Sequence, residues 1–220
     1  MFQLGEGSMS DLIAVACVGG IIALAFLAFL AVRSAKKWMA ELLEQARRLG
    51  WQKVDDPSQA PPVVAEAARS RRSVLLLYHQ QRRIWLSWHR WTETSTSGDG
   101  RSSSSRTYNL TRYFVALHGP FPDMSVVRRT AIGAFLKARR GVGTGDEEFD
   151  RRFAIKPTDS PQAARVVTPP LGHALKTGQV SEFSITSNIL GTGDHSQPDW
   201  RKLQPHAEQL SHLARLLMSR

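Results

Sequence analysis

The sequence predicts an α+β protein: one N-terminal transmembrane helix continues into a stalk and carries an antiparallel-sheet domain with short helices and a C-terminal helix. Three observations predict this plan. Residues 12–32 are an uncharged apolar run, residues 34–49 are rich in helix formers, and residues 73–129 hold aromatic and β-branched segments with partial period-2 alternation. The expected parts are a tail at residues 1–11, a span at 12–32, a helical stalk at 33–50 and a domain at 51–220.

The apolar run at residues 12–32 has the length of a membrane span. At about 1.5 Å per helical residue it extends roughly 31 Å, close to a hydrocarbon core of about 30 Å. A cleaved signal peptide would need a basic start and a shorter run, whereas Glu6 and Asp11 precede this one. A buried soluble helix would also be shorter. The run therefore predicts a single transmembrane helix.

Basic residues flank this run on one side only. Residues 1–11 contain no Lys or Arg, whereas five follow the run up to Arg48. Because Lys and Arg near a span stay on the cytoplasmic side, we expect a single-pass protein of the inner or plasma membrane, with its N-terminus outside and its C-terminal domain in the cytoplasm. The expected membrane-interface residues, which would lie at headgroup level, are Arg33, Lys36, Lys37 and Trp38.

The stalk continues the helix beyond the expected span. Its apolar residues Trp38, Leu42, Ala46 and Leu49 recur at helical spacing, and Gly50 is a residue typical of a helix end. The pattern predicts one helix of nearly forty residues. The apolar stripe is too short for a coiled coil, so either the domain or a second copy of the stalk would cover it.

The domain begins with a connection at residues 51–72 that contains one or two helical turns. Four strands are expected next, at residues 73–79, 83–94, 107–118 and 124–129. The segment at residues 95–106 has no apolar residue and is rich in Gly and Ser, which predicts a mobile hairpin loop.

The second half of the domain alternates short helices and strands. Alternating Phe149, Phe153 and Ile155 predict a strand at 149–156, and Pro205 suits the first turn of the final helix. The expected helices are at residues 130–140, 161–167, 171–176 and 205–218, with further strands at 182–187 and 189–190.

Charge is distributed unevenly along the chain. The net charge is +10, and residues 69–140 alone hold fourteen Lys and Arg against three acidic residues. Such a basic region suits the anionic lipids of the inner leaflet, a nucleic acid, or plain solvation. Because no nucleic-acid-binding motif is present, the expected partners are the lipid bilayer, anionic inner-leaflet lipids and an unidentified protein.

The cysteine, histidine and glycine-rich segments of the sequence do not indicate a catalytic, metal or cofactor site. The only cysteine, Cys17, lies in the apolar run, which excludes a disulfide scaffold or a thiolate metal site in the domain. The seven histidines show no metal-ligand spacing, and GVGTGD at residues 141–146 matches no phosphate-loop pattern. We therefore expect no metal and no cofactor, and we assign no catalytic residue. The one candidate cluster is acidic: Asp146, Glu148 and Asp150.

One stretch resembles a known group of proteins. Residues 149–169 carry Phe149, Asp150, Phe153, Asp159, Ala163, Thr168 and Pro169 in a pattern similar to the C-terminal signature of a broad family of uncharacterised bacterial membrane proteins. The N-terminal anchor and the stalk ending in Leu49, Gly50 and Trp51 are similar too. The resemblance implies a membrane-attached α+β domain and implies no established activity or catalytic residue.

Two functions follow from the sequence. The first is a membrane-tethered cytoplasmic binding or scaffolding module with a basic face. The alternative is a membrane-anchored hydrolase or transferase with a cryptic site near Asp146 to Asp150. The sequence shows no paired nucleophile and base and no metal-ligand set, which favours binding over catalysis.

Overall fold

The computed structural model describes residues 7–70, 73–96, 98, 102–129, 143–157 and 160–219. Within helices and strands, the side chains of residues 7–18, 21, 70 and 73 are not described. The chain divides into two compact units, Met1–Gln45 and Ala46–Arg220. The expected helix at residues 130–140 lies outside the described residues.

Helix α1 (Gly7–Arg48) is one continuous helix of 42 residues, as the helix-forming composition of the stalk predicts. It ends before Gly50, whose φ of +84° is favourable for glycine because glycine has no Cβ.

No helix among the described residues is long and apolar enough to cross a membrane. Over residues 22–48 of α1, the apolar run ends at Val32 and is followed by Arg33, Lys36 and Lys37, so this stretch is not apolar enough for a span. The prediction of a transmembrane helix at residues 12–32 is therefore wrong. The single-pass membrane localisation that was derived from this span is corrected with it.

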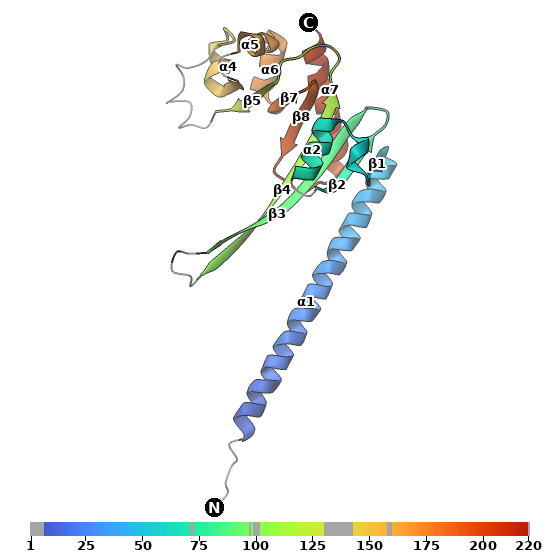
Figure 1. Cartoon of the computed structure of the whole chain (residues 1–220), viewed down its shortest axis with the longest axis vertical. Helices are drawn as coiled ribbons and strands as arrows, with labels where there is room; N and C mark the ends of the chain where they lie inside the picture. Colours follow the sequence, from blue (N-terminus) through green and yellow to red (C-terminus); the bar gives the residue numbers. More distant parts are fainter. Residues whose placement is uncertain are drawn as a thin grey trace, which may run out of the picture. The chain divides into compact units, whose positions relative to one another are not determined.

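Eight strands among the described residues form one antiparallel sheet in the order β1-β2-β3-β4-β8-β7-β5-β6 (Figure 1). The predicted α+β class of the domain is thus confirmed, and each of the four strands expected between residues 73 and 129 is present. The strands are β1 (Trp51–Lys53), β2 (Ser73–His79), β3 (Ile84–Thr96), β4 (Ser103–Ala116), β5 (Met124–Arg128), β6 (Phe153–Lys156), β7 (Phe183–Thr186) and β8 (Ile189–Asp194).

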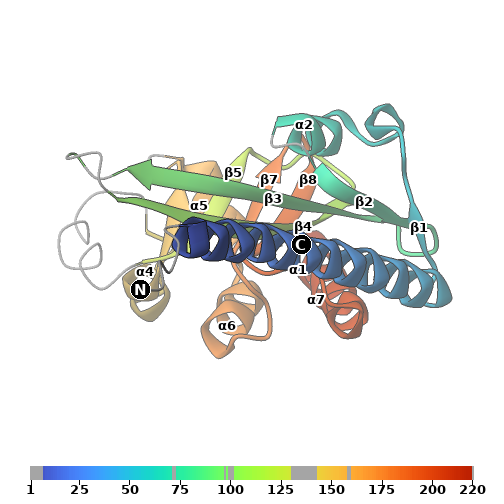
Figure 2. The same cartoon turned by 90° about the horizontal axis from the view of Figure 1, so that it is seen from below.

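Helices cover the sheet on both sides (Figure 2). Helix α2 lies on one side, here called the α2 face, whereas α4, α6 and α7 lie on the other, called the α7 face. The helical elements of this unit are the 3-10 turn η1 (Pro57–Gln59), α2 (Pro62–Ser70), α4 (Glu147–Arg152), α5 (Pro161–Val166), α6 (Pro169–Thr177) and α7 (Trp200–Met218).

Strand β4 shows how one strand serves both faces. Phe114 points to the α2 face, where it packs with Val64 and Leu76 in an apolar cluster under α2. Its neighbour Tyr113 points to the α7 face, where its ring lies 5.1 Å from that of His206 on α7. The period-2 alternation of the sequence therefore reflects burial on both faces of the sheet rather than one wet and one dry face.

The strand expected at residues 149–156 is only half correct. Residues 147–152 form α4, and β6 begins at Phe153. The carboxylate of Asp146 caps α4 by accepting a hydrogen bond from the Phe149 N–H, and the acidic residues of the first turn favour a helix start. Phe149 and Phe153 then stack at 5.0 Å between ring centroids, so the aromatic spacing read as a strand spans a helix and the strand after it.

The final helix begins earlier than expected. Asp199 caps α7 by accepting from the Arg201 N–H, so α7 starts at Trp200 and Pro205 lies inside the helix. The prediction that Pro205 marks the first turn is wrong, because the acidic cap sets the helix start. Pro205 is exposed, on the side of α7 away from the buried Leu203, Leu210 and Leu217.

Strands β3 and β4 extend beyond the sheet as a two-stranded ribbon (Figure 1). β3 pairs with β2 only up to His89, and β4 pairs with β8 only from Thr111 onward. Residues 90–96 and 103–109, here called the ribbon, pair only with each other among the described strands, and their register runs without a bulge to Thr96 and Ser103. Pairing therefore reaches further into the Ser-rich segment than the expected loop at 95–106 allowed.

Candidate functional site

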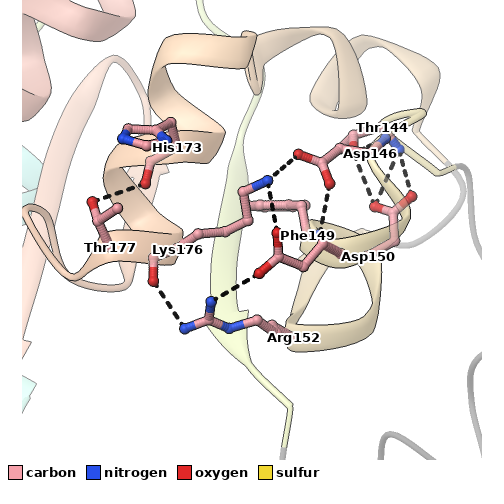
Figure 3. Close-up of polar contacts among 9 residues, drawn as sticks. Thr144, Asp146, Phe149, Asp150, Arg152, His173, Lys176 and Thr177 are labelled. Carbon is pink, nitrogen blue, oxygen red and sulfur yellow. Dashed lines mark hydrogen bonds and ion pairs between the residues drawn. The ribbon is translucent and has the colours of Figure 1, made fainter.

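The structure separates the three acidic residues Asp146, Glu148 and Asp150 into different structural roles (Figure 3). Asp146 is the N-cap of α4, with Oδ1 accepting from the Phe149 N–H at 3.0 Å. Its Oδ2 accepts a hydrogen bond from Lys176 Nζ of α6 at 2.6 Å. This carboxylate therefore joins the start of α4 to the end of α6.

Glu148 belongs to the same ion-pair cluster. Its Oε2 lies 3.3 Å from Lys176 Nζ, and its Oε1 accepts from Arg152 at 3.3 Å. Arg152 also donates to the backbone carbonyl of Lys176 at 2.9 Å. Lys176 is the centre of this cluster, and its side chain is only 18% exposed.

Asp150 faces the other way. Its carboxylate accepts a hydrogen bond from the Thr144 N–H at 3.0 Å and another from the Thr144 hydroxyl, also at 3.0 Å. A Cβ at Gly143 would lie 2.7 Å from Asp150 Oδ2, so the close approach of this carboxylate to the backbone requires glycine there. Asp150 closes the turn before α4, and its carboxylate points toward Thr144 and away from Lys176 (Figure 3).

The electrostatics fit a structural role. The hydrogen bond from Lys176 holds the pKa of the Asp146 carboxyl below its ordinary value and lowers the pKa of Glu148 in the same way. In return, its hydrogen bond with Asp146 raises the pKa of Lys176. A general acid at neutral pH needs a raised carboxyl pKa, which is the opposite shift. No group of three or more His, Cys, Asp or Glu among the described residues could hold a metal ion.

The four expected membrane-interface residues lie on α1. Arg33, Lys36 and Lys37 are exposed and Trp38 is partly exposed. Their assignment to a membrane interface depended on the span at residues 12–32, which the structure does not support.

The basic block does not form one surface in the part of the domain that is described. Arg82 in the β2–β3 turn pairs with Glu208 of α7 at 3.4 Å, and Arg129 donates to the Phe153 carbonyl at 2.9 Å. Arg106 and Arg112 share the α2 face of β4, whereas Arg90 points to the opposite face of the ribbon. Among the described arginines of this block, neighbours in sequence therefore lie on different faces of the sheet.

The sheet itself forms a groove that the sequence did not reveal. It lies on the α2 face over β4, β8, β7 and β5, and it has a volume of about 440 Å³. Its floor includes a row of directly opposed residues on four adjacent strands: Phe114, Gly191, Ser184 and Ser125. Because the two serines and the glycine are much smaller than the phenylalanine, the sheet surface is depressed beyond the Phe114 ring.

A second row adds charge. Arg112 of β4 is directly opposite Gly193 of β8, and both line the groove together with His195 and Glu182. A Cβ at Gly193 would meet its nearest neighbours at 3.7 Å, which is ordinary van der Waals contact, so a methyl group would fit there. The groove therefore combines an apolar wall, Leu110 and Phe114, with hydroxyl groups, one guanidinium and the carboxylate of Glu182.

Comparisons of the chain with protein-family models, with curated proteins and with solved structures found no match. The resemblance to a family of bacterial membrane proteins thus stays an expectation, and the geometry alone carries the functional argument.

Proposed function

We propose that residues 46–220 are a binding module, and that its ligand is a small oxyanion, a carboxylate or a phosphate, held in the groove over β4, β8, β7 and β5. The observation that carries the proposal is the depressed row of small residues beside Arg112 on the central strands. A volume of about 440 Å³ is in the range of ligand pockets, which are mostly apolar with a few polar groups.

The guanidinium of Arg112 and the neighbouring hydroxyl groups favour an anion, although the lining also includes the carboxylate of Glu182. Guanidinium groups pair with carboxylate or phosphate oxygens in a fixed fork, and hydroxyl groups of the neighbouring strands supply further donors. Ser125 and Ser184 are directly opposite each other across β5 and β7 and both line the groove. The net charge of +10 adds a long-range attraction for anions.

This proposal retains the binding function that the sequence predicts but does not retain the predicted membrane tether. The enzyme alternative has no observation in its favour among the described residues. Its candidate carboxylates are the cap of α4, a partner of Lys176 and the closure of a turn.

The test is a thermal-unfolding screen of the full chain with inorganic phosphate and with short mono- and dicarboxylates. A ligand present at 100 times its Kd stabilises by about 2.7 kcal/mol, which raises Tm by roughly 5–10 °C for a unit of this size. Gly193→Leu should abolish the shift, because Gly193 lines the groove and the larger side chain would occupy part of it. Thr186→Leu is the matched control: Thr186 is exposed on β7, on the same sheet face and outside the groove. An equal shift in the Gly193→Leu protein would remove the groove as the site.

A further inference from the structure

The outer edge of β4 in the ribbon is unpaired among the described strands. Residues 103–110 pair with β3 on one side, and β8 joins the other side only from Thr111. A two-stranded antiparallel ribbon is marginally stable by itself, so this one depends on contacts between its own strands. Such contacts are present: the Trp91 and Tyr108 rings stack at 5.4 Å, and the Thr92 and Thr107 hydroxyls lie 3.1 Å apart.

The direction of the free backbone groups follows from one hydrogen bond. The Leu117 N–H donates to the Asn188 carbonyl at 2.8 Å, so Leu117 directs its N–H toward β8. Along an antiparallel strand, alternate residues direct both backbone groups to the same side. Within the ribbon, Ser103, Ser105, Thr107 and Asn109 therefore offer their N–H and C=O groups to the unpaired edge.

This edge lacks the features with which proteins protect an exposed strand. Residues 103–110 contain no Pro and no Gly, carry a single charged side chain, Arg106, and pair with β3 without a bulge. Exposed edges are usually shortened, bulged or charged because they are templates for another strand. The edge is therefore suited to pairing with one more strand.

We propose that this strand is the β4 edge of a second copy of the chain, paired antiparallel about a two-fold axis at Thr107. In a two-fold pair, each residue is opposite the one equally far from the axis. An axis at Thr107 places Ser105 opposite Asn109 of the second copy, and both residues direct their backbone groups to this edge. The two ribbons then form one four-stranded sheet over residues 104–110, because Ser103 would fall opposite Thr111, which already pairs with β8.

Charge selects this axis over its neighbour. An axis at Arg106 would place the two Arg106 side chains directly opposite each other, and like charges in that position destabilise a sheet. With the axis at Thr107, Arg106 is opposite Tyr108 of the second copy. Arg106 already lies over the Tyr108 ring of its own chain at 5.3 Å, so the same cation–π contact becomes available across the interface.

The opposite edge of the ribbon is less suited. β3 has only residues 90–96 beyond its pairing with β2, and its central residue is Glu93. A two-fold axis at Glu93 would bring two carboxylates together. The inference concerns self-association and is independent of the groove.

Cysteine cross-linking tests the proposed axis. In the full chain with Cys17→Ser, Thr107→Cys places two thiols across the axis at a Cα separation of about 5.5 Å, within disulfide range. Ser105→Cys is the matched control on the same exposed edge. Its two copies would be roughly 13 Å apart, because they are four residues out of register. Mild oxidation should give at least about fivefold more cross-linked dimer with Thr107→Cys than with Ser105→Cys. Equal yields, or more dimer with Ser105→Cys, would overturn the proposal.

Sedimentation of proline variants is a second test that needs no cross-link. Thr107→Pro removes a backbone donor that points to the proposed interface, together with the hydroxyl contact to Thr92. Thr94→Pro removes the corresponding backbone donor on the opposite edge, because Thr94 directs its backbone away from β4. Thr107→Pro should shift the wild-type dimer toward monomer, whereas Thr94→Pro should leave the dimer intact. A wild-type protein that is monomeric at all concentrations, or a loss of dimer with Thr94→Pro alone, would contradict the inference.

Discussion

The ring of Phe114 on β4 packs against Gly191 on β8, its directly opposed residue. A Cβ at Gly191 would lie 3.3 Å from Phe114 Cδ1 and 3.4 Å from Ser184 Oγ, which is closer than ordinary van der Waals contact. Phe114 also packs under α2. One aromatic ring thus links the apolar cluster under α2 to the wall of the groove.

This packing predicts opposite effects for two glycines of β8. Gly191→Ala should lower the free energy of unfolding by about 1–2 kcal/mol, because the ring must shift to admit the methyl group. Gly193→Ala should raise it by about 0.5 kcal/mol, because its Cβ meets nothing closer than 3.7 Å and alanine restricts the unfolded chain. Urea unfolding of both variants checks the prediction. A larger loss for Gly193→Ala would contradict the described packing.

The start of α7 at Trp200 makes Pro205 an interior helix residue. Pro205→Ala should then stabilise the protein by about 1–3 kcal/mol, because alanine restores an N–H donor and removes the clash of the proline ring with the preceding turn. If the helix instead began at residue 205, alanine would bring no gain. Thermal unfolding monitored by helical circular dichroism distinguishes the two outcomes.

Two histidines predict a loss of stability in mild acid. Burial lowers the pKa of His79, whose Nδ1 accepts a hydrogen bond from the Arg82 N–H, and burial also lowers the pKa of His206. Their folded pKa values lie below the ordinary 6.5, so the unfolded chain binds more protons as the pH falls from about 7.5.

The free energy of unfolding should therefore decrease as the pH is lowered toward 5, by at most about 1.4 kcal/mol per pH unit for each histidine. Urea midpoints between pH 8 and 5 measure this. His79→Gln should reduce the slope, whereas the exposed His173→Gln should not. If the free energy of unfolding does not change over this pH range, folding lowers the pKa of neither histidine.

Disruption of the ion-pair cluster around Lys176 should lower stability without affecting anion binding in the groove. Lys176→Met removes the partner of both Asp146 and Glu148 and should lower Tm. The decrease in the free energy of unfolding should be smaller than for Phe149→Ala, which removes a fully buried ring and costs about 3–5 kcal/mol.

Lys156→Met is the control for this cluster, because Lys156 is exposed on β6. Anion-induced stabilisation of the Lys176→Met protein should match that of wild type. A selective loss of anion binding in the Lys176→Met protein would indicate that the anion binds at the Lys176 cluster and not in the groove.

The sequence predicted elements where local signals dominate. The apolar and aromatic alternation of residues 73–79 located β2 at its correct boundaries. The helix expected at residues 161–167 corresponds to α5 (Pro161–Val166), which is capped by the Ser160 hydroxyl accepting from the Ala163 N–H. The errors arose where two local signals competed: Phe149 and Phe153 suggested alternation, whereas the cap at Asp146 made the first of them helical.

The groove could not be predicted because it depends on which strands become neighbours. Gly191 and Ser184 read as ordinary residues of two short strands. They become part of the floor of one groove only because β8 lies beside β4 and β5 lies beside β7. Ser187 and Asn188, which both have positive φ, form the two-residue turn of the β7–β8 hairpin, for which the sequence carries only the weak signal of Asn188.

The strand order also has a consequence for synthesis. β4 ends at residue 116, and its sheet neighbour β8 begins only at residue 189. At 5–20 residues per second, a ribosome needs on the order of 4–15 s to deliver that neighbour after β4 has been made. During this interval the whole outer edge of β4 is open in the nascent chain. Shielding of β4 by a chaperone, or its pairing within polysomes, would therefore act on residues 111–116 as well as on the ribbon.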